Sequence, residues 1–126
     1  MKEEFTIQQI SAITGLSVHT LRYYERIGLL DPVERHPNGH RKYSRANLAW
    51  IEFLNCLRAI GMSIQQMQQY AALRSQGEQT IRERRLLLEE HHSLVNTRIQ
   101  ELTQNLMTLE EKIKYYKKME VQNNNE

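Results

Sequence analysis

The sequence predicts a mainly α-helical protein with a winged helix-turn-helix head, a small β-hairpin wing and a long C-terminal dimerisation helix. Three observations lead to this prediction: two helix-start signals separated by a glycine, an Asn-Gly turn within a basic segment, and a heptad repeat near the C-terminus. The expected domains are the head at residues 4–76, the dimerisation helix at 78–119 and a disordered tail at 120–126.

A helix-turn-helix is predicted at about residues 6–25. Thr6 is placed to cap a first helix, and Gln9 occupies the capping-box position three residues later. Gly15 suits the end of that helix, and Ser17 is the expected cap of the second. Two short helices joined by a tight turn form this motif, although such pairs also occur in proteins that do not bind DNA.

The wing is predicted at about residues 29–43. Asn38 and Gly39 can supply the positive φ angles of a hairpin turn, so two short strands are expected around them. The segment from Arg35 to Arg45 contains four arginines and lysines and no acidic residue. Because the net charge of the chain is only +2, this pattern indicates a local positive patch. Such a hairpin would place positive charge where DNA phosphates lie beside the second helix.

Two more helices are expected before the C-terminal helix. Ser44 is placed to cap a third helix that carries much of the apolar core, and Gly61 interrupts the helical pattern. Ser63 starts a fourth helix, which is expected to end near Gly77.

The last part of the sequence is typical of a coiled coil. No glycine or proline occurs from Glu78 to Met119, and apolar residues recur with a seven-residue period over five heptads. A helix over residues 81–116 would be about 54 Å long, which is more seam than a head of this size can cover. Burial of the seam therefore predicts a homodimer. The seam residues are expected to be Ile81, Leu88, Val95, Ile99, Leu102, Leu106, Leu109 and Ile113.

Several segments together resemble one protein family. These are TIQQISAITGLSVHTLRYYERIGLL, then RHPNGHRKYS, then LRAIGMSIQQM, followed by one long helix. The combination resembles the mercury-resistance regulator (MerR) family over nearly the whole chain. The resemblance implies a dimer held by an antiparallel coiled coil and bound to a palindromic promoter. It further implies that the dimer activates transcription by RNA polymerase through distortion of the double-stranded DNA between the promoter elements.

The resemblance also implies roles for individual residues. His19 and Arg22 would face base edges in the major groove, as arginine does with guanine. Tyr23 and the Tyr24 hydroxyl would approach the sugar-phosphate backbone. Alternatively, Arg22 is a solvated surface charge and Tyr24 a core residue with a satisfied hydroxyl. The full expected DNA-binding set is Ser17, His19, Thr20, Arg22, Tyr23, Tyr24, Asn38, Gly39, His40, Arg41 and Tyr43, with Arg41 and Tyr43 at wing positions that grip phosphate.

Cys56 is the only cysteine, so no intramolecular disulfide is possible. A lone cysteine at this place resembles the AdhR/NmlR-like branch of the family, whose members respond to reactive aldehydes or other electrophiles. A thiolate is the nucleophile in such chemistry. The alternative is that Cys56 is a small buried packing residue and that the effector is unrelated.

Other functions have less support in the sequence. No nucleophile-base pair, Gly-rich phosphate loop or metal-ligand cluster is apparent, so no enzyme activity, metal site or cofactor is expected. No signal peptide or membrane span is apparent either, and a cytoplasmic location is the expectation. A coiled-coil module whose winged head binds protein remains the alternative function, and it would lack salt-dependent DNA affinity.

Overall fold

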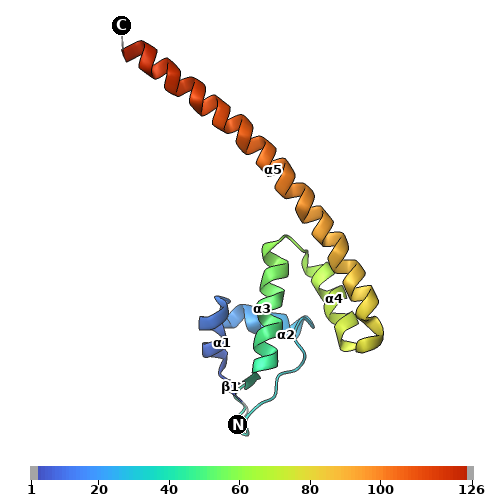
Figure 1. Ribbon diagram of the computed structural model, residues 1–126. Coiled ribbons are helices and arrows are strands. Elements are labelled where there is room, and N and C mark those ends of the chain that lie inside the picture. Colours follow the sequence, from blue (N-terminus) through green and yellow to red (C-terminus); the bar gives the residue numbers. More distant parts are fainter. Residues whose placement is uncertain (1–2, 125–126) are drawn as a thin grey trace. The chain divides into compact units, whose positions relative to one another are not determined.

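The computed structural model describes residues 3–124 and shows a mainly helical chain (Figure 1). Two compact units divide at Leu87 and Leu88, so that the head includes the first turns of the last helix. Their elements are, in order, β1 (Glu4–Phe5), α1 (Ile7–Thr14), α2 (Val18–Arg26), β2 (Tyr43–Ser44), α3 (Arg45–Ala59), α4 (Ile64–Ser75), the 3-10 helix η1 (Glu78–Thr80) and α5 (Ile81–Asn124).

The helix starts lie where the side-chain caps predict them. The Thr6 side chain accepts a hydrogen bond from the Gln9 amide, and the Gln9 side chain accepts one from the Thr6 amide, which completes a capping box. Ser17 caps α2 in the same way through the amide of Thr20. Gly15 ends α1 with a left-handed φ of 78°. The helix-turn-helix therefore forms at the predicted place.

The small sheet differs in its pairing from the predicted hairpin. β1 and β2 are antiparallel, with Phe5 opposite Tyr43, so the wing's second strand pairs with the N-terminus. Within the wing the ladder is reduced to one bridge, between Arg35 and Arg41. Backbone hydrogen bonds still join its two arms, from the Lys42 amide to the Glu34 carbonyl at 2.8 Å, for example. The wing is therefore a hairpin whose arms are too short to form regular strands.

The turn at the tip of the wing also differs from the expectation that Asn38 and Gly39 both adopt positive φ angles. The amide of Gly39 donates to the carbonyl of His36, and the amide of His36 donates to the carbonyl of His40. Gly39 has a φ of 87°, whereas no non-glycine residue among those described has a positive φ. The loop therefore contains three residues, with Pro37 at the second position of the turn and glycine in the left-handed position.

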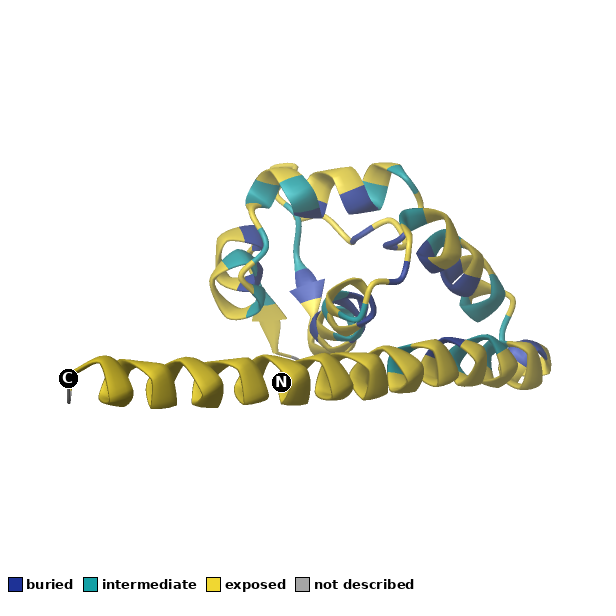
Figure 2. Cartoon of the chain, turned by 90° about the horizontal axis from the view of Figure 1, so that it is seen from above, coloured by how far each residue is buried: buried dark blue, intermediate teal, exposed yellow. Residues whose placement is uncertain are grey.

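The core of the head lies between its helices, where α1 packs on α2 and α3, and α3 packs on α4 (Figure 2). Trp50 of α3 joins several elements, because its indole N–H donates to the Leu29 carbonyl at 2.8 Å and its ring stacks on Tyr70 of α4. The guanidinium of Arg74 lies 4.1 Å from the centre of the same ring. The largest fully buried side chains are Tyr24, Tyr43, Ile10, Leu21, Leu29, Ile51, Leu54, Leu57 and Met67.

Helix α5 is uninterrupted from Ile81 to Asn124. The expectation of a disordered tail from residue 120 is corrected for residues 120–124, which continue the helix. Residues 125–126 of that tail lie outside the described part. The extension has a simple cause: residues 120–124 contain no glycine or proline that would stop a helix. None of the helices described is both long enough and apolar enough to cross a membrane.

Tyr43 lies beneath the wing, and its side chain is fully buried. Its hydroxyl has no hydrogen-bond partner among the described residues. The expectation that Tyr43 grips phosphate is therefore corrected: this residue supports the wing from the core. Burial raises the pKa of the Tyr43 hydroxyl above its ordinary value, and the nearby Arg41 opposes that rise.

Replacing this hydroxyl gives a direct test of its burial. We expect Tyr43→Phe to leave the free energy of unfolding unchanged or to raise it by about 1 kcal/mol at neutral pH, because an unsatisfied buried hydroxyl is removed. As pH rises from about 10 through the raised pKa, the wild type should lose stability that the variant keeps, since tyrosine ionises more easily in the unfolded chain. Denaturant melts at several pH values would measure both effects. A variant less stable at neutral pH by more than about 1 kcal/mol would show that the hydroxyl has a partner.

Candidate nucleic-acid interface

The outward face of α2 presents a row of polar side chains. Leu21 and Tyr24 are buried, which turns the opposite side of the helix toward solvent. His19, Arg22 and Tyr23 are exposed there, and 37% of the surface of Tyr23 is accessible. Positions 22 and 23 lie three and four residues after position 19, so both side chains neighbour His19 on the helix surface, and the three form one exposed ridge, here called the recognition ridge. A ridge of this kind has the width and the donors needed to enter a major groove.

Two of the predicted contact residues have local structural roles. The Ser17 hydroxyl caps α2 and bonds the Thr20 hydroxyl at 2.9 Å. Tyr24 is only 1% exposed, and its hydroxyl accepts a hydrogen bond from Arg58 at 3.0 Å. The structure thus agrees with the alternative in which Tyr24 is a core residue with a satisfied hydroxyl.

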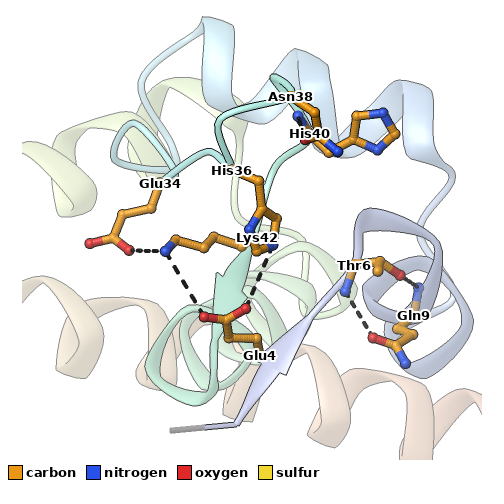
Figure 3. Close-up of polar contacts among 8 residues, drawn as sticks. All are labelled: Glu4, Thr6, Gln9, Glu34, His36, Asn38, His40 and Lys42. Atoms are coloured by element: carbon orange, nitrogen blue, oxygen red, sulfur yellow. Dashed lines mark hydrogen bonds and ion pairs between the residues drawn. The ribbon is translucent and has the colours of Figure 1, made fainter.

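The tip of the wing is exposed. Short polar contacts hold the wing (Figure 3). The Asn38 side chain accepts from the His40 amide at 3.1 Å, which stabilises the turn. At the base, Lys42 lies 3.4 Å from Glu34 and 3.9 Å from Glu4 (Figure 3). His36 Nε2 lies 3.6 Å from the same Glu4 carboxylate.

The positive charge of this segment is largely compensated in the fold. Arg41 donates through Nε to the Glu25 carboxylate at 2.7 Å, and Arg35 lies 3.9 Å from the other oxygen of Glu25. Arg45 pairs with Glu3. The wing is therefore less positive than the prediction of a local basic patch implies, because the acidic partners come from distant parts of the sequence.

A cleft of about 300 Å³ separates the wing from the helix-turn-helix. Arg22 and Arg41 contribute positive charge to it, and Ile7 and Gln8 line it at the start of α1. The first amides of a helix lack intrahelical partners and attract anions. Its complete lining is Thr6, Ile7, Gln8, Arg22, His36, Asn38, Gly39, His40 and Arg41. Such a cleft can hold a phosphate group of a nucleic-acid backbone.

A second cleft, of about 400 Å³, lies on the other side of the recognition ridge. Arg58 of α3 reaches it beside Tyr23, and Ser63 caps the adjoining start of α4. Sequence reasoning missed Arg58 and Ser63 as members of this surface. No local pattern marks them, because Arg58 meets Tyr24 across 34 positions of sequence. Glu25, Arg35 and the start of α1 were missed for the same reason.

Cys56 lies on α3 and is exposed in the single chain. Its neighbours Leu54 and Leu57 are buried, so the thiol points away from the core that they form. This placement does not fit the alternative of a buried packing residue. No group of three or more metal-binding side chains occurs within residues 3–124.

The predicted seam residues of α5 are mostly exposed in the single chain. Leu88 and Val95 are partly covered. The exposed members are Ile81, Ile99, Leu102, Leu106, Leu109 and Ile113, with exposed fractions between 45% and 61%. Exposure of this many large apolar side chains along one helix indicates an interaction surface.

Two family models match the sequence. One, described as MerR HTH family regulatory protein, matches residues 5–73. The other, described as MerR, DNA binding, matches residues 48–112. Together they cover the helix-turn-helix, the wing, α3, α4 and most of α5.

Individual relatives agree with these models. The chain is 40% identical over 90 residues to the HTH-type transcriptional regulator AdhR of Bacillus subtilis, covering 71% of this chain and 64% of AdhR. It is 35% identical to an uncharacterised HTH-type transcriptional regulator of Haemophilus influenzae, covering 90% of this chain and 84% of the relative. The crystal structure of HiNmlR, a MerR family regulator lacking the sensor domain and bound to promoter DNA, matches with a TM-score of 0.84 and 34% identity over 92% of both chains. These relatives are transcriptional regulators and not enzymes. The chain belongs to the MerR family of DNA-binding helix-turn-helix transcriptional regulators.

Proposed function

We propose that this regulator binds a palindromic promoter spacer as a homodimer and activates transcription by distorting the DNA for RNA polymerase. We further propose that it responds to reactive aldehydes or other electrophiles through Cys56. The observation that carries the proposal is the recognition ridge of α2 between two clefts, each with an arginine at its edge.

The ridge and the clefts suit the two kinds of contact that a specific DNA-binding protein makes. Arg22 is exposed on the ridge, where it can donate two hydrogen bonds to a guanine. Arg41 and Arg58 lie to either side, where they can meet phosphates and fix the register of the ridge in the groove. The crystal structure of HiNmlR on promoter DNA supports this mode of binding.

The proposed dimer follows from the apolar surface of α5. Leu102 is 61% exposed and Leu109 is 57% exposed in the single chain, and each buried CH₂ group would contribute about 0.8 kcal/mol. A second α5 has the same heptad spacing and would cover these residues by coiled-coil packing. A dimer also fits the proposed palindromic site, since a two-fold protein would match two half-sites in opposite directions.

The proposed sensing step needs a thiol that a small electrophile can reach. Cys56 is exposed and is the only cysteine of the chain, so it is the side chain with the chemistry to form a covalent adduct. The likeness to AdhR supports an assignment to the electrophile-responsive branch.

Base reading by Arg22 can be tested against a matched arginine on the same helix. We expect Arg22→Ala to weaken binding by about 1–3 kcal/mol and to flatten the preference at one base pair per half-site. Arg26 is also exposed but lies 5.5 Å from the centre of the Tyr23 ring, so Arg26→Ala should keep the preference. Binding to duplexes that the wild type selects from a random pool would measure this. Equal base preferences in the wild type and the Arg22 variant would contradict the assignment.

The dimer can be tested by charging its seam. Replacing both Val95 and Leu102 with Asp would bury like charges in the seam between the two α5 helices, so this double variant should be monomeric in sedimentation experiments. Leu94 and Met107 are also exposed but fall outside the two heptad positions of the seam, so replacing both with Asp should leave the dimer intact. A stable dimer of the first variant would show that the seam lies elsewhere.

The sensor role of Cys56 predicts a separation of binding from response. Cys56→Ser and Cys56→Ala should keep operator binding and melting temperature, because the side chain is exposed. Both should lose induction by aldehydes in a reporter assay, since neither side chain supplies a thiolate. An intact aldehyde response in the alanine variant would rule out the sensor role.

A further inference from the structure

We infer that Glu25 is a positioning residue, which holds the wing against the recognition helix so that the wing's arginines face the DNA backbone. Glu25 is itself negatively charged, although it lies beside the surface that is proposed to bind the negatively charged DNA backbone. The inference rests on the proposed mode of DNA binding, but it assigns Glu25 a role that DNA contacts alone do not require.

The contacts of Glu25 join α2 to both arms of the wing. Its Oε2 accepts from Arg41 Nε at 2.7 Å, and its Oε1 lies 3.9 Å from a terminal nitrogen of Arg35. Arg35 and Arg41 are the two residues that face each other in the bridge at the base of the wing. One carboxylate therefore contacts both arms of the hairpin at this bridge.

The pair is shielded enough to be energetically useful. The side chain of Glu25 is 15% exposed and that of Arg41 is 19% exposed, whereas the pair between Glu34 and Lys42 includes a glutamate that is 81% exposed. Solvent screens an exposed pair strongly and a partly buried pair less. Of these two acidic contacts, that of Glu25 is the one able to fix the wing.

The wing needs such a contact because its own structure is slight. Residues 36–40 are exposed, one bridge joins the arms, and the regular sheet begins only at Tyr43. Segments with few buried contacts open locally at low cost. Because Arg41 bonds Glu25 through Nε, its two terminal nitrogens remain available as donors, and Arg41 lines the cleft that Arg22 shares. Glu25 thus orients the Arg41 guanidinium without occupying its terminal nitrogens.

Because Glu25 is negatively charged, the direction in which DNA affinity changes on its removal tests the inference. A carboxylate near the DNA repels phosphate, so its removal should strengthen binding if Glu25 does nothing else. If Glu25 positions the wing, its removal should weaken binding even though the protein becomes more positive. Glu34 is the matched control, since it carries the same charge on the wing and pairs with Lys42 at the surface.

The experiment compares Glu25→Ala and Glu25→Gln with Glu34→Ala and Glu34→Gln in the full chain. The probe is a duplex that the wild type selects from a random pool, titrated at several salt concentrations below the melting temperature of each variant. We expect Glu34 variants to bind as tightly as the wild type or up to about threefold more tightly. Glu25→Ala should bind about tenfold more weakly. Its salt slope, which is the change in the logarithm of affinity with the logarithm of salt concentration, should fall by about one for each lost phosphate contact. Glu25→Gln should lie between these, because its amide oxygen still accepts from Arg41.

The salt slope separates positioning from a general loss of folded protein, which would lower the apparent affinity and leave the slope unchanged. Glu25 variants that bind as tightly as Glu34 variants, or that weaken with an unchanged slope, would overturn the inference. If Glu25→Ala does not fold, Glu25→Gln gives the same decision against Glu34→Gln. A wild type that selects no duplex would overturn the proposed mode of DNA binding instead.

Discussion

The burial of one face of α2 is the constraint on which the DNA-binding surface depends. Leu21 and Tyr24 are almost fully removed from solvent, and the packing of α1 on α2 and α3 keeps them there. Because a helix has a fixed pitch, burial of these two residues determines that Arg22 and Tyr23 lie outside. The two adjacent tyrosines therefore have different roles, one in the core and one on the surface.

A second set of contacts fixes the path of the chain between α2 and the wing. The segment after α2 is held by the Trp50 indole at the Leu29 carbonyl and by Gln68, which donates to the Ile27 carbonyl at 3.0 Å. Arg74 lies 3.7 Å from Asp31 further along the same segment. The chain thus leaves the recognition helix along a path that α3 and α4 define, and the wing begins from that path.

Much of this arrangement could be predicted from local sequence signals. The caps at Thr6, Ser17 and Ser63 mark helix starts because each hydroxyl bonds an amide only three residues away. The heptad spacing likewise predicts an uninterrupted α5. The recognition ridge follows from helix periodicity together with the family resemblance.

The remaining features depend on contacts between distant residues, which no local pattern encodes. Charge compensation of the wing requires Glu3, Glu4 and Glu25 to approach residues that are far away in sequence. The burial of Tyr43 depends on its pairing with β1. The Tyr24 hydroxyl has a hydrogen-bond partner because Arg58 donates to it. At the wing tip, Pro37 takes the second position of the turn, so Gly39 has a positive φ and Asn38 does not, unlike the expectation from Asn-Gly alone.

The position of Trp50 has an optical consequence. It is the only tryptophan of the chain, and it is enclosed by Tyr70 and the Arg74 guanidinium at the junction of α3 and α4. Selectively excited indole emission of this protein therefore originates at that junction. A change in its intensity or wavelength would report a rearrangement between these two helices, with no added label and no dye near the recognition ridge.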